Sequence, residues 1–166
     1  MQYQLSDFKS IKHFIFDIDG VLTNGSLIVD NDGSLLRTMN IKDGYAMQLA
    51  IKKGFTISVI SGAKGDGLHK RFLGLGIESI YLDISEKAVV FSELVKSDYL
   101  AVQNTLYMGD DMPDLQVMKE VYFPCCPADA CHEIKEVSKY ISPYKGGEGC
   151  VRDVIEKVLK LNDCWE

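Results

Sequence analysis

The sequence predicts an α/β fold in which a doubly wound parallel sheet carries helices on both faces. Short apolar runs of strand length alternate along the chain with segments of helical spacing, a pattern typical of parallel strands joined by right-handed crossovers. Each apolar run also ends abruptly in polar residues, such as Asp17 and Ser61. Ligands of such sheets bind beyond the carboxyl ends of the strands, so these polar residues are the first candidates for a functional site.

Four apolar runs predict the core strands. They are residues 13–16 before Asp17, residues 55–60 before Ser61-Gly62, residues 79–82 before Asp83, and residues 105–108 before Gly109-Asp110-Asp111. A continuous apolar run indicates a strand that is buried on both faces. The sequence therefore places all four strands inside the sheet, with their polar ends at one edge.

Helical spacing is found between the strands, in residues 45–53, 67–75, 87–96 and 115–120. Residues 151–161 carry an apolar stripe that is typical of a core-facing helix. One segment breaks the alternation, because residues at about 26–39 predict an inserted β-hairpin around Asp32-Gly33. An isolated hairpin is marginally stable in water, so we expect this one to pack on another subunit.

Composition narrows the classes of protein. The chain has 166 residues, of which 46% are hydrophobic, which suits one domain spanning residues 1–166. A net charge of -6 argues against nucleic acid and anionic membranes as partners, so an anionic substrate needs a local positive site. No apolar run approaches membrane-spanning length, and residues 1–12 lack the apolar core of a secretory signal, so we expect a cytoplasmic protein.

The five cysteines are expected to be reduced thiols, because their number is odd and their spacing irregular. Cys125, Cys126, Cys131 and His132 are near neighbours in the sequence. They do not form a recognised ligand pattern, so zinc is disfavoured.

Acidic residues at two strand ends predict a magnesium site. Asp17 and Asp19 follow the first strand with Gly20 behind them, and Asp110 follows another strand. Converging acids repel one another unless a cation compensates, and Mg²⁺ prefers oxygen ligands. Asp114, one helical turn further on, could ligate the ion or bind the loop. A single Asp is more often a turn residue, which is our interpretation of Asp30 and Asp83.

Two further residues could hold phosphate oxygens. Ser61-Gly62 offers a hydroxyl and backbone amides after the second strand. Lys87 should open a helix at the same edge, where its charge could neutralise phosphate. Each is weak evidence alone, since a turn and a surface lysine are the common alternatives.

In their order along the chain these residues resemble the four motifs of the haloacid dehalogenase superfamily of phosphatases. The motifs correspond to residues 17–23, Ser61, Lys87 and residues 109–114. The resemblance implies the Rossmann-like fold of that superfamily. It also implies that Asp17 is the nucleophile and Asp19 the general acid and later base. Asp17, the Asp19 backbone carbonyl and Asp110 would then hold Mg²⁺.

By the same resemblance, Ser61 and Lys87 would hold the phosphoryl group. Gly62, Asp111 and Asp114 would support them, with Asp111 orienting Lys87. Too few residues separate Thr23 from the second strand for a cap domain, so the chain resembles the capless members of the superfamily.

Among capless members the chain is similar to the 3-deoxy-D-manno-octulosonate 8-phosphate phosphatases. The hairpin, Lys42-Asp43-Gly44 and the segment at residues 146–152 carry this resemblance. It implies a small anionic sugar-phosphate substrate and a homotetramer in which a neighbouring subunit completes each active site. The alternative substrate is 2-keto-3-deoxynonulosonate 9-phosphate or another sugar-acid phosphate, because Ala63-Lys64 matches neither group. The candidate substrate contacts are Asp43, Gly44, Lys64, Arg71 and Arg152.

A signalling receiver domain is an alternative of another class. It also combines an α/β sandwich with an acidic pair, a Ser or Thr and a Lys, and Asp83 would be its phosphorylated residue. The order of the motifs argues against it, because receivers place the acidic pair on the first strand and the lysine last. An inactive scaffold of the same fold is disfavoured because no catalytic motif position is substituted.

Overall fold

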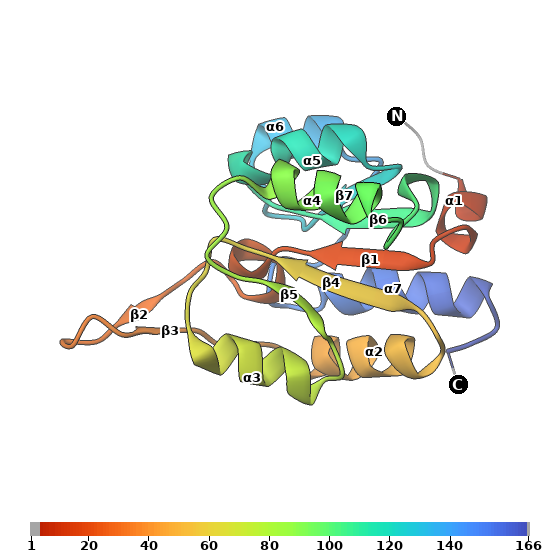
Figure 1. Ribbon diagram of the computed structural model, residues 1–166. Helices are drawn as coiled ribbons and strands as arrows, with labels where there is room; N and C mark the ends of the chain where they lie inside the picture. The colour runs from red at the N-terminus through yellow and green to blue at the C-terminus, as the bar shows by residue number, and fades with distance from the viewer. Residues whose placement is uncertain (1–3, 166) are drawn as a thin grey trace.

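The computed structural model describes residues 4–165 and contains a six-stranded sheet in the order β5-β4-β1-β6-β7-β8 (Figure 1). All neighbouring strands in this sheet are parallel. The strands are β1 (His13–Phe16), β4 (Thr56–Ile60), β5 (Ser79–Tyr81), β6 (Thr105–Met108), β7 (Phe123–Cys126) and β8 (Tyr140–Ile141). The predicted parallel α/β fold is therefore confirmed.

The central strand β1 fixes where the functional residues meet. Its last residue, Phe16, is in register with Val59 of β4 on one side and Met108 of β6 on the other. The carboxyl ends of β1, β4 and β6 therefore lie next to each other. The chain leaves these three strands at one edge of the sheet, as the sequence predicted.

Helices cover both faces of the sheet. In Figure 1, α4 (Lys87–Lys96), α5 (Leu115–Glu120) and α6 (His132–Val137) lie above it, and α2 (Ile41–Lys52), α3 (Asp66–Gly74) and α7 (Cys150–Leu161) lie below. The shorter segments are α1 (Leu5–Lys9) and the turns η1 (Ile18–Leu22), η2 (Val102–Asn104) and η3 (Met112–Asp114).

Each face of the sheet has its own hydrophobic core because side chains alternate along β1. Phe14 and Phe16 belong to the cluster that includes α2 and α7, whereas Ile15 belongs to the cluster that includes α4 and α5. The apolar stripe of α7 is buried as predicted, at Val151, Val154, Ile155, Val158 and Leu159.

Helix α2 begins at Ile41, four positions before the predicted start at residue 45. The Asn40 side chain accepts a hydrogen bond from the backbone N of Lys42 at 2.8 Å, so Asn40 caps the helix. Gly44 in the first turn obscured this start in the sequence, because glycine is a poor helix former.

The predicted hairpin is present and projects from the body (Figure 1). It pairs β2 (Ile28–Val29) with β3 (Leu35–Leu36) in antiparallel register, so its regular strands are shorter than the segment at 26–39. The backbone N of Asp30 donates to Ser34 O at 2.9 Å, and Gly33 has φ 86°. Its apolar side chains lie in solvent in the single chain, with Ile28 62% and Val29 69% exposed.

Strands β7 and β8 and helices α1 and α6 were missed by the sequence interpretation. Cys125 and Cys126 are buried in β7, whereas His132 at the start of α6 is exposed and lies 3.3 Å from Glu136. All five cysteines are free thiols. Among the described residues, no helix has the length and apolar character needed to cross a bilayer.

Candidate active site

The predicted motif residues line one hollow of about 420 Å³ at the carboxyl edge of the sheet. They come from the ends of β1, β4 and β6 and from the start of α4. The predicted residues found there are Asp17, Asp19, Ser61, Gly62, Lys87, Asp110, Asp111 and Asp114. Residues far apart in the sequence therefore converge as parallel-sheet topology requires.

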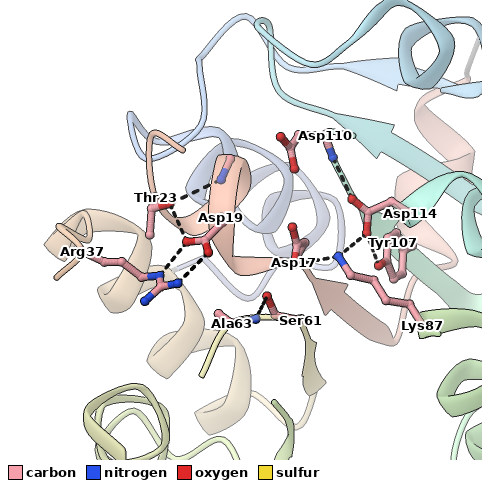
Figure 2. Close-up of polar contacts among 11 residues, drawn as sticks. Asp17, Asp19, Thr23, Arg37, Ser61, Ala63, Lys87, Tyr107, Asp110 and Asp114 are labelled. Carbon is pink, nitrogen blue, oxygen red and sulfur yellow. Dashed lines mark hydrogen bonds and ion pairs between the residues drawn. The ribbon is translucent and has the colours of Figure 1, made fainter. Parts of the chain in front are cut away.

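Asp17 is the acid at the floor of the hollow. It is 5% exposed, and its Oδ1 lies 2.8 Å from the Nζ of Lys87 (Figure 2). Burial, and then the neighbouring Asp114, raise the pKa of Asp17 to about 6, although Lys87 opposes the shift. The backbone N of Asp17 donates to Met108 O at 3.1 Å, which ties this residue to β6.

Lys87 lies between two carboxylates. Its Nζ is 2.8 Å from Asp17 and 2.7 Å from Asp114, and its side chain is only 5% exposed (Figure 2). Burial lowers the pKa of Lys87, but the two carboxylates outweigh it, so the pKa is raised overall. Lys87 is therefore a fixed positive charge at the centre of the hollow.

The prediction that Asp111 orients Lys87 is wrong, because Asp114 has this position. Asp111 is exposed, and its carbonyl accepts a hydrogen bond from the backbone N of Asp114 at 2.9 Å. That bond closes the turn η3, which leaves Asp111 exposed and places Asp114 in the buried interior. Asp114 therefore contacts Lys87 in the way that was expected of Asp111.

Donors surround both oxygens of Asp114. Besides Lys87, the hydroxyl of Tyr107 donates to Oδ1 at 2.5 Å, and the backbone N of Asp110 donates to Oδ2 at 3.2 Å. Burial, and then the charge of Asp114, raise the pKa of Tyr107 well above its usual value, so it stays a neutral donor. A Cβ on Gly109 would lie 2.4 Å from the Cβ of Asp114, so this close packing requires glycine.

The acids fit a divalent cation. Asp17, Asp110 and Asp114 each offer an oxygen, and these atoms all lie within 4.8 Å of one another. Burial, followed by the charges of Asp17 and Asp114, raises the pKa of Asp110 to about 8. One lysine cannot balance three close carboxylates, whereas a hard cation with oxygen ligands can. Since donors already occupy Asp114, the carboxylates of Asp17 and Asp110 are the better ligands.

Glycine at position 20 is required by the same cluster. Gly20 has φ 91°, and a Cβ there would lie 2.0 Å from Oδ2 of Asp110. The Asp110 carboxylate therefore packs directly on the backbone that follows Asp19.

Asp19 points to a different partner, Arg37 at the base of the hairpin. Nε of Arg37 is 2.8 Å from Oδ1 of Asp19, and Nη2 is 2.9 Å from Oδ2 (Figure 2). Thr23 Oγ1 also donates to Oδ1 at 3.3 Å. Sequence reasoning missed Arg37. The available signal was a lone arginine directly after an apolar hairpin strand.

Ser61 is held by contacts between two loops. Its backbone N donates to Tyr81 O at 2.9 Å, and its carbonyl accepts from the N of Ile84 at 3.1 Å. Its Oγ accepts from the N of Ala63 at 3.2 Å, which leaves the hydroxyl hydrogen available for a ligand. Gly62 beside it is exposed at the rim.

The candidate substrate contacts are divided among several places. Asp43 is buried, and its Oδ1 accepts from the backbone N of Arg152 at 2.7 Å, at the start of α7. The Arg152 side chain pairs with Glu156 at 3.1 Å and lies 5.0 Å from the Trp165 ring. Neither residue lines the hollow that contains Asp17.

Lys64 and Arg71 line a second hollow of about 410 Å³, between the hairpin and α3. Lys64 also pairs with Asp83 at 2.8 Å, and both side chains are exposed. Gly44 lies against Arg71, because a Cβ on Gly44 would be 2.6 Å from Nη2 of Arg71. Asp83 itself is not among the residues that line the acidic hollow.

Comparisons with known proteins match both the sequence and the fold. Residues 74–155 match the family of haloacid dehalogenase-like hydrolases. The 3-deoxy-D-manno-octulosonate 8-phosphate phosphatase KdsC of Escherichia coli (strain K12) is 33% identical over 151 residues, which cover 91% of this chain and 80% of that protein.

Two crystal structures have the same architecture. That of 3-deoxy-D-manno-octulosonate 8-phosphate phosphatase from Yersinia pestis superposes with a TM-score of 0.93 at 30% identity, covering 97% of this chain and 87% of the other. The enzyme from Moraxella catarrhalis, in complex with magnesium ion, phosphate ion and a KDO molecule, has a TM-score of 0.92 at 30% identity, with coverages of 97% and 92%. These matches contradict the receiver alternative.

Proposed function

The chain belongs to the haloacid dehalogenase-like hydrolases, and we propose that it is a magnesium-dependent phosphatase acting on 3-deoxy-D-manno-octulosonate 8-phosphate. The observation that carries the proposal is the buried arrangement of Asp17, Lys87 and Asp114 at the edge of the sheet. It places a carboxylate nucleophile beside a fixed cation, inside a hollow that can admit a phosphate group.

In the proposed reaction, an Asp17 carboxylate oxygen attacks phosphorus and forms a new P–O bond. The bond between phosphorus and the leaving oxygen breaks, and its electron pair stays on that oxygen. The leaving oxygen then takes a proton from Asp19. Water then attacks the aspartyl phosphate and gives its proton to Asp19. Inorganic phosphate leaves, and the free Asp17 carboxylate is restored.

The other residues would position the transferred group. Lys87 and the Ser61 hydroxyl would donate to phosphoryl oxygens, with the backbone of Gly62 at the rim. Asp114 would hold Lys87 in place, since it accepts from Nζ at 2.7 Å. Asp17, Asp110 and the Asp19 carbonyl would hold Mg²⁺. The ion, when bound, offsets the negative charge of the carboxylates and the phosphate.

The substrate is expected to be an anionic sugar acid. The second hollow adjoins the hairpin and carries Lys64 and Arg71, which could meet a carboxylate. Because Ala63-Lys64 matches neither related group, 2-keto-3-deoxynonulosonate 9-phosphate or another sugar-acid phosphate is the alternative substrate.

We further infer one catalytic domain over residues 1–166 and a homotetramer in which hairpins pack together. The exposed apolar residues of the hairpin support this assembly, because large apolar patches rarely face water. A cytoplasmic location is consistent with five free cysteines, which persist in reducing compartments.

The test is phosphate release with Mg²⁺ from a panel of the octulosonate 8-phosphate, the nonulosonate 9-phosphate and common sugar phosphates. We expect the octulosonate ester to have the highest kcat/KM, and Asp17→Asn to abolish turnover. Asp98→Asn is the matched control, because Asp98 is exposed and its φ of 56° suits asparagine. No turnover of any ester, or full activity in Asp17→Asn, would refute the proposal.

A further inference from the structure

Arg37 is the hairpin residue with the closest connection to the proposed chemistry. Its side chain is only 7% exposed, although neighbouring hairpin residues project into solvent. It forms two hydrogen bonds with Asp19, one to each carboxylate oxygen, at 2.8 and 2.9 Å. A bidentate guanidinium–carboxylate pair fixes orientation more strongly than a single bond does.

The two oxygens of Asp19 differ in how many donors they have. Oδ1 accepts from both Arg37 Nε and Thr23 Oγ1, whereas Oδ2 accepts from Arg37 Nη2. Within residues 4–165, no hydrogen bond from another donor to Oδ2 is found. Because a carboxylate oxygen has two lone-pair sites, Oδ2 keeps one that can exchange a proton.

We propose that Arg37 is a positioning residue, which holds Asp19 so that Oδ2 exchanges the proton with the leaving oxygen and later with water. The inference rests on the proposed function. It links the hairpin to proton transfer, because Arg37 directly follows β3 (Leu35–Leu36) and its two bonds orient the Asp19 carboxylate. Asp19 lies in η1, where its own backbone is extended and not helical.

Direct substrate binding by Arg37 is the competing explanation. Arg37 lines the second hollow with Lys64 and Arg71, but it is not among the residues that line the acidic hollow. Both of its nearest bonds go to Asp19. The geometry therefore favours an effect on Asp19 over an effect on substrate affinity.

The leaving group separates these explanations. An alkoxide of a sugar phosphate needs a proton as it leaves, whereas p-nitrophenolate does not. We expect Arg37→Gln to lower kcat/KM for the sugar phosphate by about 10- to 100-fold. For p-nitrophenyl phosphate, kcat/KM should stay within about threefold of wild type, while kcat and KM fall together.

The fall in kcat follows because Asp19 also accepts the proton of water in the second step. Dephosphorylation then becomes limiting, so a burst of p-nitrophenolate stoichiometric with enzyme should appear. In an Asp19→Asn background, Arg37→Gln should change kcat/KM for the sugar phosphate by less than about twofold, because residues that act through one group are non-additive.

The matched control is Lys160→Gln, which removes a cation from the exposed pair with Glu156 on α7. Lys160→Gln should leave kcat and KM for both esters unchanged. Arg37→Lys should recover part of the sugar-phosphate activity that Arg37→Gln loses. Equal losses of kcat/KM on both esters, or additive losses in the Asp19→Asn background, would overturn the positioning role. Absence of sugar-phosphate hydrolysis by wild type would instead refute the proposed function.

Discussion

Asp111 and Asp114 belong to the same loop but have opposite surroundings. Asp114 is 1% exposed and binds Lys87, whereas Asp111 is exposed. We expect Asp114→Asn to lower kcat by about 100-fold or more, because Lys87 loses the carboxylate that positions it. Asp111→Asn should keep kcat within about threefold of wild type. Initial rates of phosphate release measure both, and comparable losses in the two variants would contradict our assignment.

Asp43 is predicted to make stability depend on pH. Burial raises the pKa of Asp43 from its ordinary value of 3.8 to about 6, although hydrogen bonds from the backbone of Arg152 and Gly149 oppose the shift. The folded chain therefore keeps this proton at pH values where the unfolded chain has lost it. Its stabilising contribution is complete below the unfolded pKa and is lost as the pH rises through the folded pKa.

Asp43→Asn removes this dependence while its amide oxygen can still accept from the N of Arg152. We compare the free energy of unfolding of the variant with that of wild type at two pH values. We expect this difference to be more favourable to the variant at about pH 7.5 than at about pH 4.5, by on the order of 2 kcal/mol. Urea unfolding at both pH values measures it. Asp7→Asn is a control, because a backbone bond from Gln4 lowers the pKa of Asp7 from its ordinary value of 3.8, so its effect on stability should not vary between these two pH values. A difference between Asp43→Asn and wild type that does not vary with pH would contradict the prediction.

Among the secondary-structure elements, the sequence predicted the buried strands that consist of a continuous apolar run and the helices with a clear helical spacing. β1 and β6 are continuous apolar runs with every residue buried, and helices α4 and α5 have their predicted bounds. β7 is equally buried but was missed. It contains Pro124 and two cysteines, which carry little strand signal because proline cannot donate to a ladder. In the folded sheet, pairing with β6 and β8 outweighs the weak strand preference of these residues.

The residues of the candidate site also fall into those that the sequence predicted and those that it did not. Asp17, Ser61 and Lys87 could be predicted because each stands at the end of a strand or the start of a helix, and topology then brings them together. The exchange of Asp111 for Asp114 depends on the turn η3, and the Arg37–Asp19 pair depends on how the hairpin folds back. Both are three-dimensional contacts that residue spacing does not encode.

At the scale of the whole molecule, charge is distributed unevenly. The chain carries a net charge of -6, yet Arg37, Lys64 and Arg71 gather in the hollow beside the acidic site. An anionic substrate would therefore be attracted locally, while the rest of the surface repels polyanions. This hollow is bounded on one side by Leu35 and Leu36 of the hairpin, so its shape depends on what the hairpin contacts.

The hairpin should therefore decide both assembly and turnover. Val29 is 69% exposed in the single chain, and a charge there would be costly if hairpins pack against each other. We expect Val29→Asp to convert the proposed tetramer to monomers in sedimentation velocity. It should also lower kcat/KM for the sugar phosphate by about tenfold or more, because neighbouring subunits would no longer close the hollows.

Val89→Asp is the matched control for this experiment, since Val89 is 50% exposed on α4, at a distance from the hairpin in Figure 1. It should preserve both the assembly and the rate. A wild-type monomer with full activity would exclude a shared site. A Val29→Asp tetramer would instead place the subunit interface elsewhere, and the apolar face of the hairpin would then need another partner. Loss of assembly in Val29→Asp alone, together with the lower rate, would tie the exposed hairpin to catalysis through its neighbours.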